Sequence, residues 1–504
     1  MHFMLLKSSP ILVAGLLAGC VTPSTRYEAP ARPKNVLFIM ADDLGWGELG
    51  SYGQEKIRTP HLDRLADEGL RLTQAYSGAP VCAPCRNVLM TGKHLGHVTV
   101  RGNKPAQDAN GKRVEGQHPI PADAVTIAEL FQAAGFRTGC FGKWGLGPVG
   151  SSGDPNAQGF DRFYGYNCQR VAHSYYPPHL WSDGDKEIIN PEPIRGHQKQ
   201  PEGEVLAATY QAQTYAPDRI LEEAVRFLEA NADEPFFCYV PFVEPHVAMQ
   251  PPTEHVESYP QEWDERPYRG QCGYTPHPRP RAGYAAMITD LDEHVGTLMA
   301  TLERLGLAQD TLVVFTSDNG TTHDHGRSPH FGVGGVDADF FESTADLRGK
   351  KGSVYEGGLR VPFLVRWPGH VAAGSVDDRP TYFPDVMPTL CAACGLEAPA
   401  DVDGIDQLNV WTGDGDPAPR NPMVWVFPEY SGQVAVRFGN WKLIRRGLKR
   451  KNKGPDAWEL YDMVNDRGET TNVADEHPDV VAEGRAILRD QADDNPIFPV
   501  PIPD

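Results

Sequence analysis

The sequence lacks a hydrophobic run of membrane-spanning length: the apolar residues 11–19 form the longest candidate near the N-terminus, and no later segment qualifies. A helix that crosses a bilayer needs about 20 apolar residues. The sequence also lacks an excess of basic residues, since 47 Lys and Arg against 67 Asp and Glu give a net charge of -20. We therefore expect no nucleic-acid partner. An anionic substrate is not excluded, because a few cations in a cleft can dominate the local field.

The N-terminal segment has the features of a targeting signal. Lys7 gives it a positive start, residues 11–19 are apolar, and Leu17-Ala18-Gly19-Cys20 resembles a bacterial lipobox. We therefore predict a lipoprotein signal peptide over residues 1–20, a lipidated Cys20, and an extended tether over residues 21–33. The protein would then be exported and held on a membrane of the bacterial cell envelope, in the periplasm or at the cell surface. A plain signal peptide cleaved nearby is the alternative.

Cysteine is scarce, with nine residues in 504. Export would place them in an oxidising compartment, where disulfides can form. Cys20 and Cys82 have other interpretations, and the remaining seven (nine minus two) are an odd number, so no complete pairing scheme follows. Cys391 and Cys394 lie in an apolar stretch, which favours buried free thiols.

Alternating apolar β-rich and helical patterns predict a doubly wound α/β fold with a mostly parallel sheet over residues 34–415. The predicted strands are residues 36–40, 137–141, 236–243 and 311–316, and the predicted helices are residues 125–134, 219–231 and 284–305. From about residue 416 the pattern changes. A hairpin near 433–445, a strand at 458–462 and a helix at 478–491 predict a smaller α+β domain over residues 416–504.

Four of the predicted strands end on polar residues. These are Asp42-Asp43, Lys143, His246 and Asp318-Asn319. In open α/β sheets the ligand site lies beyond the carboxyl ends of the strands, so these side chains are expected to converge. A single acidic residue is more often a turn or cap residue, but two pairs at strand ends favour a metal site. Their all-oxygen chemistry suits a hard cation such as calcium or magnesium better than zinc.

The segment Cys82-Ala83-Pro84-Cys85-Arg86 is the most informative in the chain. Pro84 is well placed to start a helix, which would put Cys82 at or just before a helix N-terminus, where anions are favoured. A redox Cys-x-Pro-Cys pair and a structural disulfide are alternatives. Neither explains Arg86, and a small redox domain would not need the two acidic pairs.

This segment, continued by Leu89-Met90-Thr91-Gly92, resembles the signature of the type I, formylglycine-dependent sulfatases, an arylsulfatase A-like family of the alkaline phosphatase superfamily. Further matches run through residues 34–475. They include Asn35–Gly45, Gly142-Lys143-Trp144, Pro245-His246, Thr316–Gly320, Arg348–Lys351, Glu356–Pro362 and Glu459–Asp462. The resemblance implies a sulfuric ester hydrolase with the fold of that superfamily.

The resemblance also implies a mechanism and its residues. A formylglycine-generating or sulfatase-maturating enzyme would oxidise Cys82 to formylglycine, whose hydrated aldehyde attacks sulfur and later expels sulfate. Calcium would be bound by Asp42, Asp43, Asp318, Asn319 and the modified Cys82. Arg86 would orient the nucleophile, Lys143 and Lys351 would hold sulfate oxygens, and His246 would protonate the leaving oxygen.

One position departs from the family pattern. Where the family often has Gly-Lys-Trp-His-Leu-Gly, this chain has Gly145 in place of the histidine. That histidine normally helps to deprotonate the diol for sulfate release. The base for this step is therefore open, with Lys143 or a histidine from another loop as substitutes.

Two segments are candidates for binding the rest of the substrate. Residues 166–180 contain Gln169, Arg170, His173, Tyr175 and Tyr176, and residues 321–341 contain His323, His325, His330, Asp337 and Asp339. Structural loops are an equally good interpretation. Both resemble carbohydrate sulfatases, including ones for galactose or N-acetylgalactosamine, so we predict a sulfated glycan substrate that contacts His173 and Arg170. A phosphatase or phosphonate hydrolase of the superfamily and a non-catalytic glycan-binding lipoprotein are the alternatives.

Overall fold

The computed structural model describes residues 32–502, apart from residues 325, 327 and 329. The predicted signal peptide, including Cys20, and most of the predicted tether lie outside the described residues. The chain from Arg32 onward forms one compact unit. Within this described part, no helix is both long and apolar enough to pass through a membrane.

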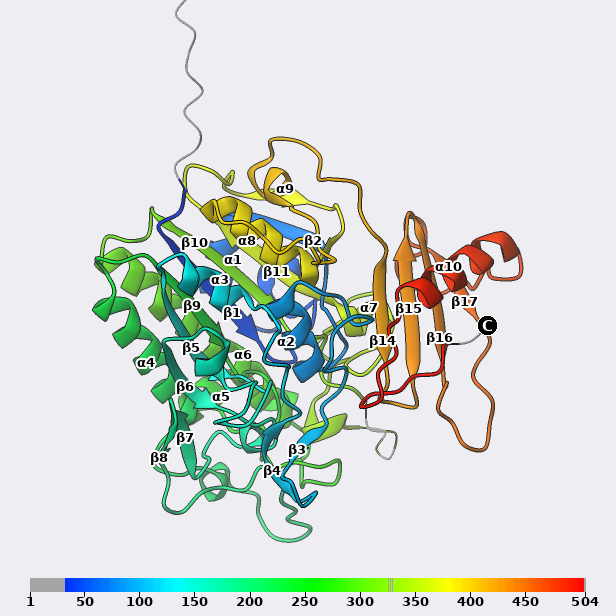
Figure 1. Ribbon diagram of the computed structural model, residues 1–504. Helices are drawn as coiled ribbons and strands as arrows, with labels where there is room; N and C mark the ends of the chain where they lie inside the picture. The colour runs from blue at the N-terminus through cyan, green and yellow to red at the C-terminus, as the bar shows by residue number, and fades with distance from the viewer. Residues whose placement is uncertain (1–31, 325, 327, 329, 503–504) are drawn as a thin grey trace, which may run out of the picture. The chain divides into compact units, whose positions relative to one another are not determined.

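An 11-stranded sheet forms the centre of the unit (Figure 1), in the order β12-β2-β11-β10-β1-β9-β5-β6-β7-β8, with β13 paired to β2. Neighbouring strands from β10 to β6 run parallel. On one side of this parallel centre, β11 pairs antiparallel with β10, and β2 pairs antiparallel with β11. On the other side, β7 pairs antiparallel with β6. The strands are β1 (Asn35–Ala41), β2 (Leu70–Tyr76), β5 (Arg137–Lys143), β6 (Arg162–Tyr166), β7 (His179–Ser182), β8 (Asp185–Ile188), β9 (Phe236–Pro241), β10 (Thr311–Ser317), β11 (Arg360–Arg366), β12 (Ser375–Asp377) and β13 (Thr381–Tyr382). A separate short hairpin pairs β3 (Pro105–Gln107) with β4 (Arg113–Gln117).

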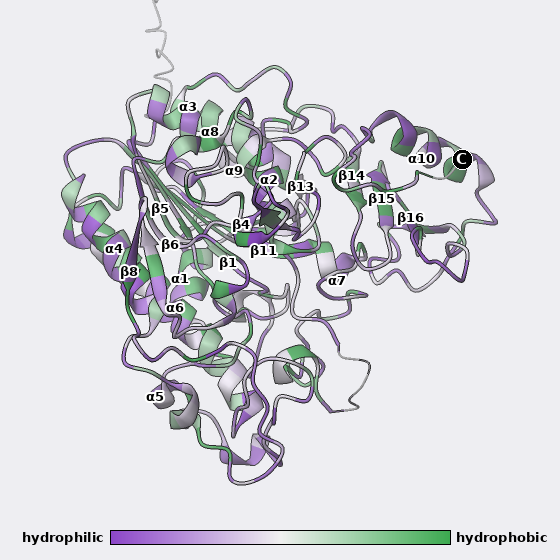
Figure 2. Ribbon diagram, turned by 60° about the horizontal axis from the view of Figure 1, so that its bottom comes forward, coloured by the Kyte–Doolittle hydropathy of each residue, from purple (hydrophilic) through white to green (hydrophobic). Residues whose placement is uncertain are grey.

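Both faces of this sheet are covered by helices. Successive side chains of β1 alternate between two apolar clusters, so that Val36 and Phe38 belong to one cluster and Leu37 and Ile39 to the other. Figure 2 shows the mixed hydrophobic and hydrophilic colouring of the covering helix α4. The first cluster includes residues of α2 (Cys82–Thr91), α3 (Ile127–Ala133) and α8 (Val386–Cys394); the second includes residues of α1 (Pro60–Asp67), α4 (Ala216–Ala230) and α6 (Pro280–Arg304).

The C-terminal part is a four-stranded antiparallel sheet with one helix. The sheet has the order β14 (Met423–Phe427), β15 (Gln433–Phe438), β16 (Trp441–Arg446), β17 (Glu459–Asp462), and α10 (Pro478–Asp490) packs against it. Alternation again divides the side chains: Trp425 joins the main core, whereas Val424 and Val426 pack with Leu488 of α10. The small helices are α5 (Thr253–Glu257), α7 (Glu356–Leu359) and α9 (Leu408–Thr412), and short 3-10 turns complete the described elements.

A buried ion cluster connects this smaller sheet to the segment before β11. Lys442 on β16 lies 2.8 Å from Glu356 and 2.9 Å from Glu469, and all three side chains are fully buried. The second oxygen of Glu469 accepts a hydrogen bond from the backbone N–H of Glu356 at 2.7 Å. This cluster ties the C-terminal sheet to α7, five residues after Lys351.

The predicted fold class is confirmed, with a doubly wound, mostly parallel sheet and a smaller C-terminal sheet. Most predicted boundaries differ from the structure by one to four residues; for example, β9 ends at Pro241 rather than at 243, α4 begins at Ala216 rather than at 219, and α6 begins at Pro280 rather than at 284. Among the described residues, all eight cysteines are unpaired and buried, as predicted for Cys391 and Cys394.

Candidate active site

The ends of four neighbouring parallel strands bring the predicted polar residues together. The residues at these ends are Asp42 and Asp43 after β1, Lys143 at the end of β5, His246 after β9, and Asp318 and Asn319 after β10. The order β10-β1-β9-β5 places the four ends side by side. All six side chains are buried. The convergence expected from the strand pattern is therefore present in the structure.

Cys82 is the first residue of α2, directly after the extended residue Val81. Its side chain is 1% exposed, and its Sγ lies 3.3 Å from Oδ1 of Asp42 and 3.5 Å from Nζ of Lys351. Burial, followed by the charge of Asp42, raises the pKa of the thiol. A thiol is nucleophilic only as the thiolate, so the unmodified Cys82 is a poor nucleophile.

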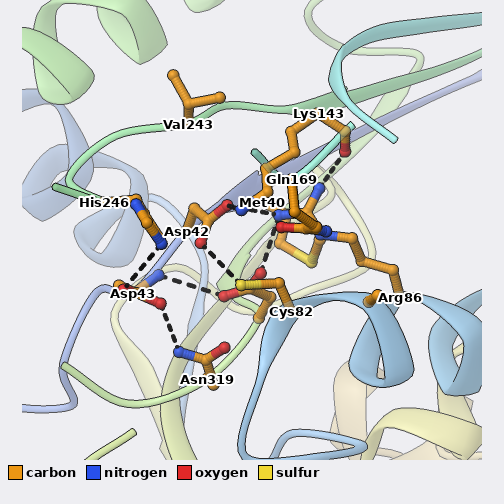
Figure 3. A network of polar contacts seen from close by, with 12 residues as sticks. Met40, Asp42, Asp43, Cys82, Arg86, Lys143, Gln169, Val243, His246 and Asn319 are labelled. Atoms are coloured by element: carbon orange, nitrogen blue, oxygen red, sulfur yellow. Dashed lines mark hydrogen bonds and ion pairs between the residues drawn. The ribbon is translucent and has the colours of Figure 1, made fainter. Parts of the chain in front are cut away.

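Three cations lie against the acidic residues, and Figure 3 shows two of them, Arg86 and Lys143. Arg86 donates to Asp42 at 3.1 Å and to Asp318 at 2.8 Å. Lys143 forms an ion pair with Asp42, and Lys351 donates to both oxygens of Asp43 at 2.6 and 2.8 Å. Buried charges persist in proteins only when they are paired, and here three carboxylates meet three cations.

The acidic residues differ in their electrostatic surroundings. Burial raises the pKa of Asp42, but the nearby cationic groups, with Lys143 first, outweigh burial and lower it overall. Burial and the neighbouring Asp42 raise the pKa of Asp318 to about 6. The cluster therefore keeps at least one strongly acidic carboxylate at its centre.

The donor atoms of this cluster fit a hard metal ion. Nδ2 of Asn319 donates to Asp43 at 2.8 Å, whereas Oδ1 of Asn319 is buried and makes no hydrogen bond with any described residue. Such an oxygen is available as a ligand. Ligand atoms of Asp42, Asp43, Cys82 and His246 also lie within 4.8 Å of one another. Carboxylate and amide oxygens dominate the set, which suits calcium or magnesium.

His246 has one ring nitrogen fixed by the backbone. Its Nδ1 is hydrogen-bonded to the carbonyl of Val247, which can only accept, so Nδ1 carries a proton. The other nitrogen, Nε2, lies 3.7 Å from Asp43 and faces the cluster. Burial, followed by Lys351 and Lys143, lowers the pKa of His246. Nε2 is therefore the ring atom that can exchange a proton with a ligand.

A pocket of about 510 Å³ opens above the cluster. Cys82, Asp43, His246 and Lys351 lie at its base, and its other walls come from Arg170, His173, Tyr274, His323 and Tyr430 and from the β3–β4 hairpin. Sequence reasoning missed Tyr274, Tyr430 and the hairpin, because they belong to no motif.

The two residues predicted to bind substrate both line this pocket. Arg170 is exposed at the rim. The ring of His173 stacks on the ring of His246 with 5.2 Å between centroids, and its Nδ1 lies 3.0 Å from Nε2 of His197. His173 therefore contacts a predicted catalytic residue, which its position in the sequence did not indicate.

Several other residues of the two candidate segments lie outside the active-site pocket. Tyr175 and Tyr176 are core residues rather than pocket residues, and the hydroxyl of Tyr175 donates to the carbonyls of Val243 and His246 at 3.0 and 2.7 Å. For these two tyrosines, the structural interpretation of the segment therefore applies. His330, Asp337 and Asp339 line a neighbouring pocket of about 410 Å³, and His325 lies outside the described residues.

Comparison with known proteins agrees with this geometry. The sequence profile of the sulfatase family matches residues 34–396, and that of the N-sulphoglucosamine sulphohydrolase C-terminal region matches residues 349–491. The chain belongs to the sulfatase family. The predicted family and the predicted enzyme class, a hydrolase of sulfate esters, are thereby confirmed.

Individual relatives support the same assignment. This sulfatase is 34% identical to arylsulfatase A of Homo sapiens over 481 residues, covering 88% of this chain and 84% of that protein. It is 29% identical to the N-acetylgalactosamine-6-O-sulfatase of Bacteroides thetaiotaomicron, covering 94% and 96%. Among solved structures, Ps i-CgsB in complex with k-i-k-neocarrahexaose is similar with a TM-score of 0.72 and 26% identity, over 91% of this chain and 92% of that one.

Proposed function

We propose that this sulfatase removes sulfate from a carbohydrate, with a formylglycine made from Cys82 and a bound calcium ion. The position of Cys82 Sγ gives the strongest support, because it lies at the start of α2 between the carboxylate of Asp42 and the ammonium of Lys351. A nucleophile at this point faces the pocket and the cations together. A structural disulfide would instead need a partner thiol, and Cys82 is unpaired.

Asp42, Asp43, Asp318 and Asn319 would hold the calcium ion, and the modified Cys82 would complete its ligands. The modified Cys82 would supply a hydrated aldehyde as nucleophile, and the calcium ion would supply a Lewis acid for the sulfuryl oxygens. Lys143 and Lys351, which here pair with Asp42 and Asp43, would donate to the sulfate oxygens and stabilise the negative charge that these oxygens carry in the transition state.

His246 would protonate the ester oxygen as it leaves. The Val247 carbonyl holds the proton on Nδ1 and leaves Nε2 directed toward the cluster. A general acid has to reach the leaving atom within hydrogen-bonding distance, and the pocket base allows this because it contains both His246 and Cys82. Arg86 would keep the nucleophile oriented through its bonds to Asp42 and Asp318.

We further propose that the substrate is a sulfated galactose or N-acetylgalactosamine unit of a glycan. The pocket walls combine aromatic and hydrogen-bonding side chains, among them Arg170, His173 and Tyr274, as sugar binding requires. The relatives that support this class are the N-acetylgalactosamine-6-O-sulfatase and the structure that contains a neocarrahexaose.

The decisive experiment measures the peptide that contains Cys82. The protein is expressed with a sulfatase-maturating enzyme, its Cys82 peptide is analysed by mass spectrometry, and sulfate release is measured on a panel of defined sulfated sugars. Formylglycine together with sulfate release is the expected result, and Cys82→Ala is the inactive control. An intact thiol in protein from the native host, without sulfate release, would support the glycan-binding alternative. Preferred cleavage of phosphate esters would support the phosphatase.

We also propose that the enzyme is exported and anchored in the cell envelope through a lipid on Cys20. The apolar residues 11–19 and the lipobox-like sequence before Cys20 support this. In the native host, the wild-type protein should sediment with membranes, and Cys20→Ala should release it from them. Equal membrane association of both forms would exclude this anchor.

A further inference from the structure

The space beside Gly145, where the family pattern often has histidine, is filled by a side chain from another strand. Gly145 has a φ of +81°, and a β-carbon there would lie 2.4 Å from Nε2 of Gln169. Gln169 follows β6, whose last residue, Tyr166, lies opposite Lys143 on β5. A fifth parallel strand therefore delivers a residue to the same edge of the sheet as the four strands described above.

Gln169 is held in place, yet its amide nitrogen has no partner. Its backbone N–H donates to Oε1 of Gln117 at 2.9 Å, and Asn167 in the same loop donates to the carbonyl of Gly147 at 2.8 Å. The Gln169 side chain is 6% exposed, and its Nε2 makes no hydrogen bond with any described residue. Buried polar atoms without partners are rare in native proteins, so this one is expected to meet a ligand.

The ligand that reaches Gln169 must enter the active-site pocket. Gln169 lines that pocket together with Cys82, His246 and Lys351. Figure 3 shows Gln169 among the side chains of the charged cluster, with Lys143 and Arg86. A donor placed here faces the same pocket as the ammonium group of Lys351, which attracts sulfate.

We propose that Gln169 binds the sulfate group of the substrate by donating a hydrogen bond from Nε2 to a sulfate oxygen. This inference rests on the proposed function, since it needs a sulfate ester in the pocket. An amide does not ionise near neutral pH, so Gln169 cannot replace histidine as a base. Instead, Gln169 takes the place of the side chain at position 145 as a contact to the sulfuryl group. Its hydrogen bond strengthens as negative charge develops on the sulfate oxygen.

The test compares Gln169→Glu, Gln169→Ala and wild type. The glutamate has nearly the same shape but offers no donor and brings a negative charge toward the sulfate. Both variants should lower kcat/KM by about a hundredfold or more, on a small aryl sulfate and on a sulfated glycan alike. Binding of inorganic sulfate, measured by calorimetry without turnover, should weaken by at least about tenfold. Gln213→Glu is the matched control, because Gln213 is exposed and lies outside the pocket lining.

Each outcome decides the proposal. Calcium content and formylglycine conversion are first shown to be equal in all proteins. A loss on the glycan alone would mean that Gln169 contacts the sugar, and unchanged sulfate binding would also overturn the proposal. If Gln169→Glu does not fold, the uncharged Gln169→Ala decides by the same criteria. A wild-type enzyme that is fully converted but hydrolyses no sulfate ester would refute the proposed function instead, independently of the variants.

Discussion

Replacing Lys442 by methionine is expected to destabilise the protein in a pH-dependent manner. Lys442 is the ion-pair partner of both Glu356 and Glu469 inside a fully buried cluster. After its loss, Glu356 still has Arg360 at 3.5 Å and the hydroxyl of Tyr76 at 2.7 Å. Glu469 keeps only its bond to the backbone N–H of Glu356. The uncompensated charge would therefore be that of Glu469.

The size of the effect follows from the protonation of Glu469. Breaking a buried ion pair by removing one partner costs about 3–5 kcal/mol. In the wild type, burial raises the pKa of Glu469 from 4.5 to about 7, although Lys442 opposes this rise. The pKa of Glu469 is higher in the folded protein than in the unfolded chain, so protonation of Glu469 stabilises the fold. This stabilisation is complete below the unfolded pKa of 4.5 and is lost as pH rises through about 7.

Lys442→Met would raise the pKa of Glu469 further. Below about pH 7, Glu469 is protonated in both proteins, and the difference in the free energy of unfolding should be at its smallest, because only the ion pair of Lys442 with Glu356 is then lost. Above about pH 7, the difference in the free energy of unfolding should grow by about 1.4 kcal/mol per pH unit, until it reaches the cost of breaking the pair of Lys442 with Glu469. Urea unfolding at about pH 6 and about pH 9, with calcium present, measures this.

Two variants make this prediction refutable. Adding Glu469→Gln to Lys442→Met removes the unpaired carboxylate, so the double variant should recover most of the stability at high pH and lose the pH dependence. Lys112→Met, on an exposed turn, should change stability by less than about 0.5 kcal/mol. An equal loss at both pH values, or no recovery in the double variant, would contradict the assigned role of Glu469.

Three further predictions concern the active site. Cys82→Ala should abolish sulfate release, whereas Cys85→Ser should largely retain it; activity that survives in the first but not in the second would refute the nucleophile assignment. Elemental analysis should find one calcium per chain and much less in Asp43→Ala, and stoichiometric zinc would instead support the phosphatase. His173→Ala should lower kcat/KM on the glycan by about ten- to two-hundred-fold. Because His173 also stacks on His246, a smaller loss is expected on aryl sulfates, and equal losses would exclude a sugar contact.

Much of the central sheet could be predicted because its pattern is local. The uninterrupted apolar run before Asp42 predicts a strand buried on both faces, and the structure has β1 fully buried from Asn35 to Ala41. The motif around Cys82 predicts a helix start at or just after Cys82, and α2 begins at Cys82 with Pro84 as its third residue. Edge strands such as β8 were not predicted, because three of its four residues are exposed and carry no apolar alternation.

Residues whose roles depend on distant partners could not be predicted. Lys442 pairs with Glu356, 86 positions away, and nothing in its own segment shows that it is buried. Gln169 has a special environment only because β6 pairs with β5 and Gly145 leaves space beside it. The stacking of His173 on His246 likewise depends on how two loops meet. Sequence patterns report local periodicity, whereas these contacts are set by tertiary packing.

The pairing of β1 has a consequence for the order of events during synthesis. Its two neighbours begin about 200 and about 275 residues later, since Val36 pairs with Phe237 and Asn35 with Thr311. Contacts of such long range form slowly, because the intervening chain must close a large loop first. Until β10 has been made, β1 lacks one of its two neighbouring strands. Cys82 then also lacks the later residues that pack on it, such as Lys351. On the proposed function, conversion of Cys82 to formylglycine would fall in this interval, because the complete fold buries the thiol.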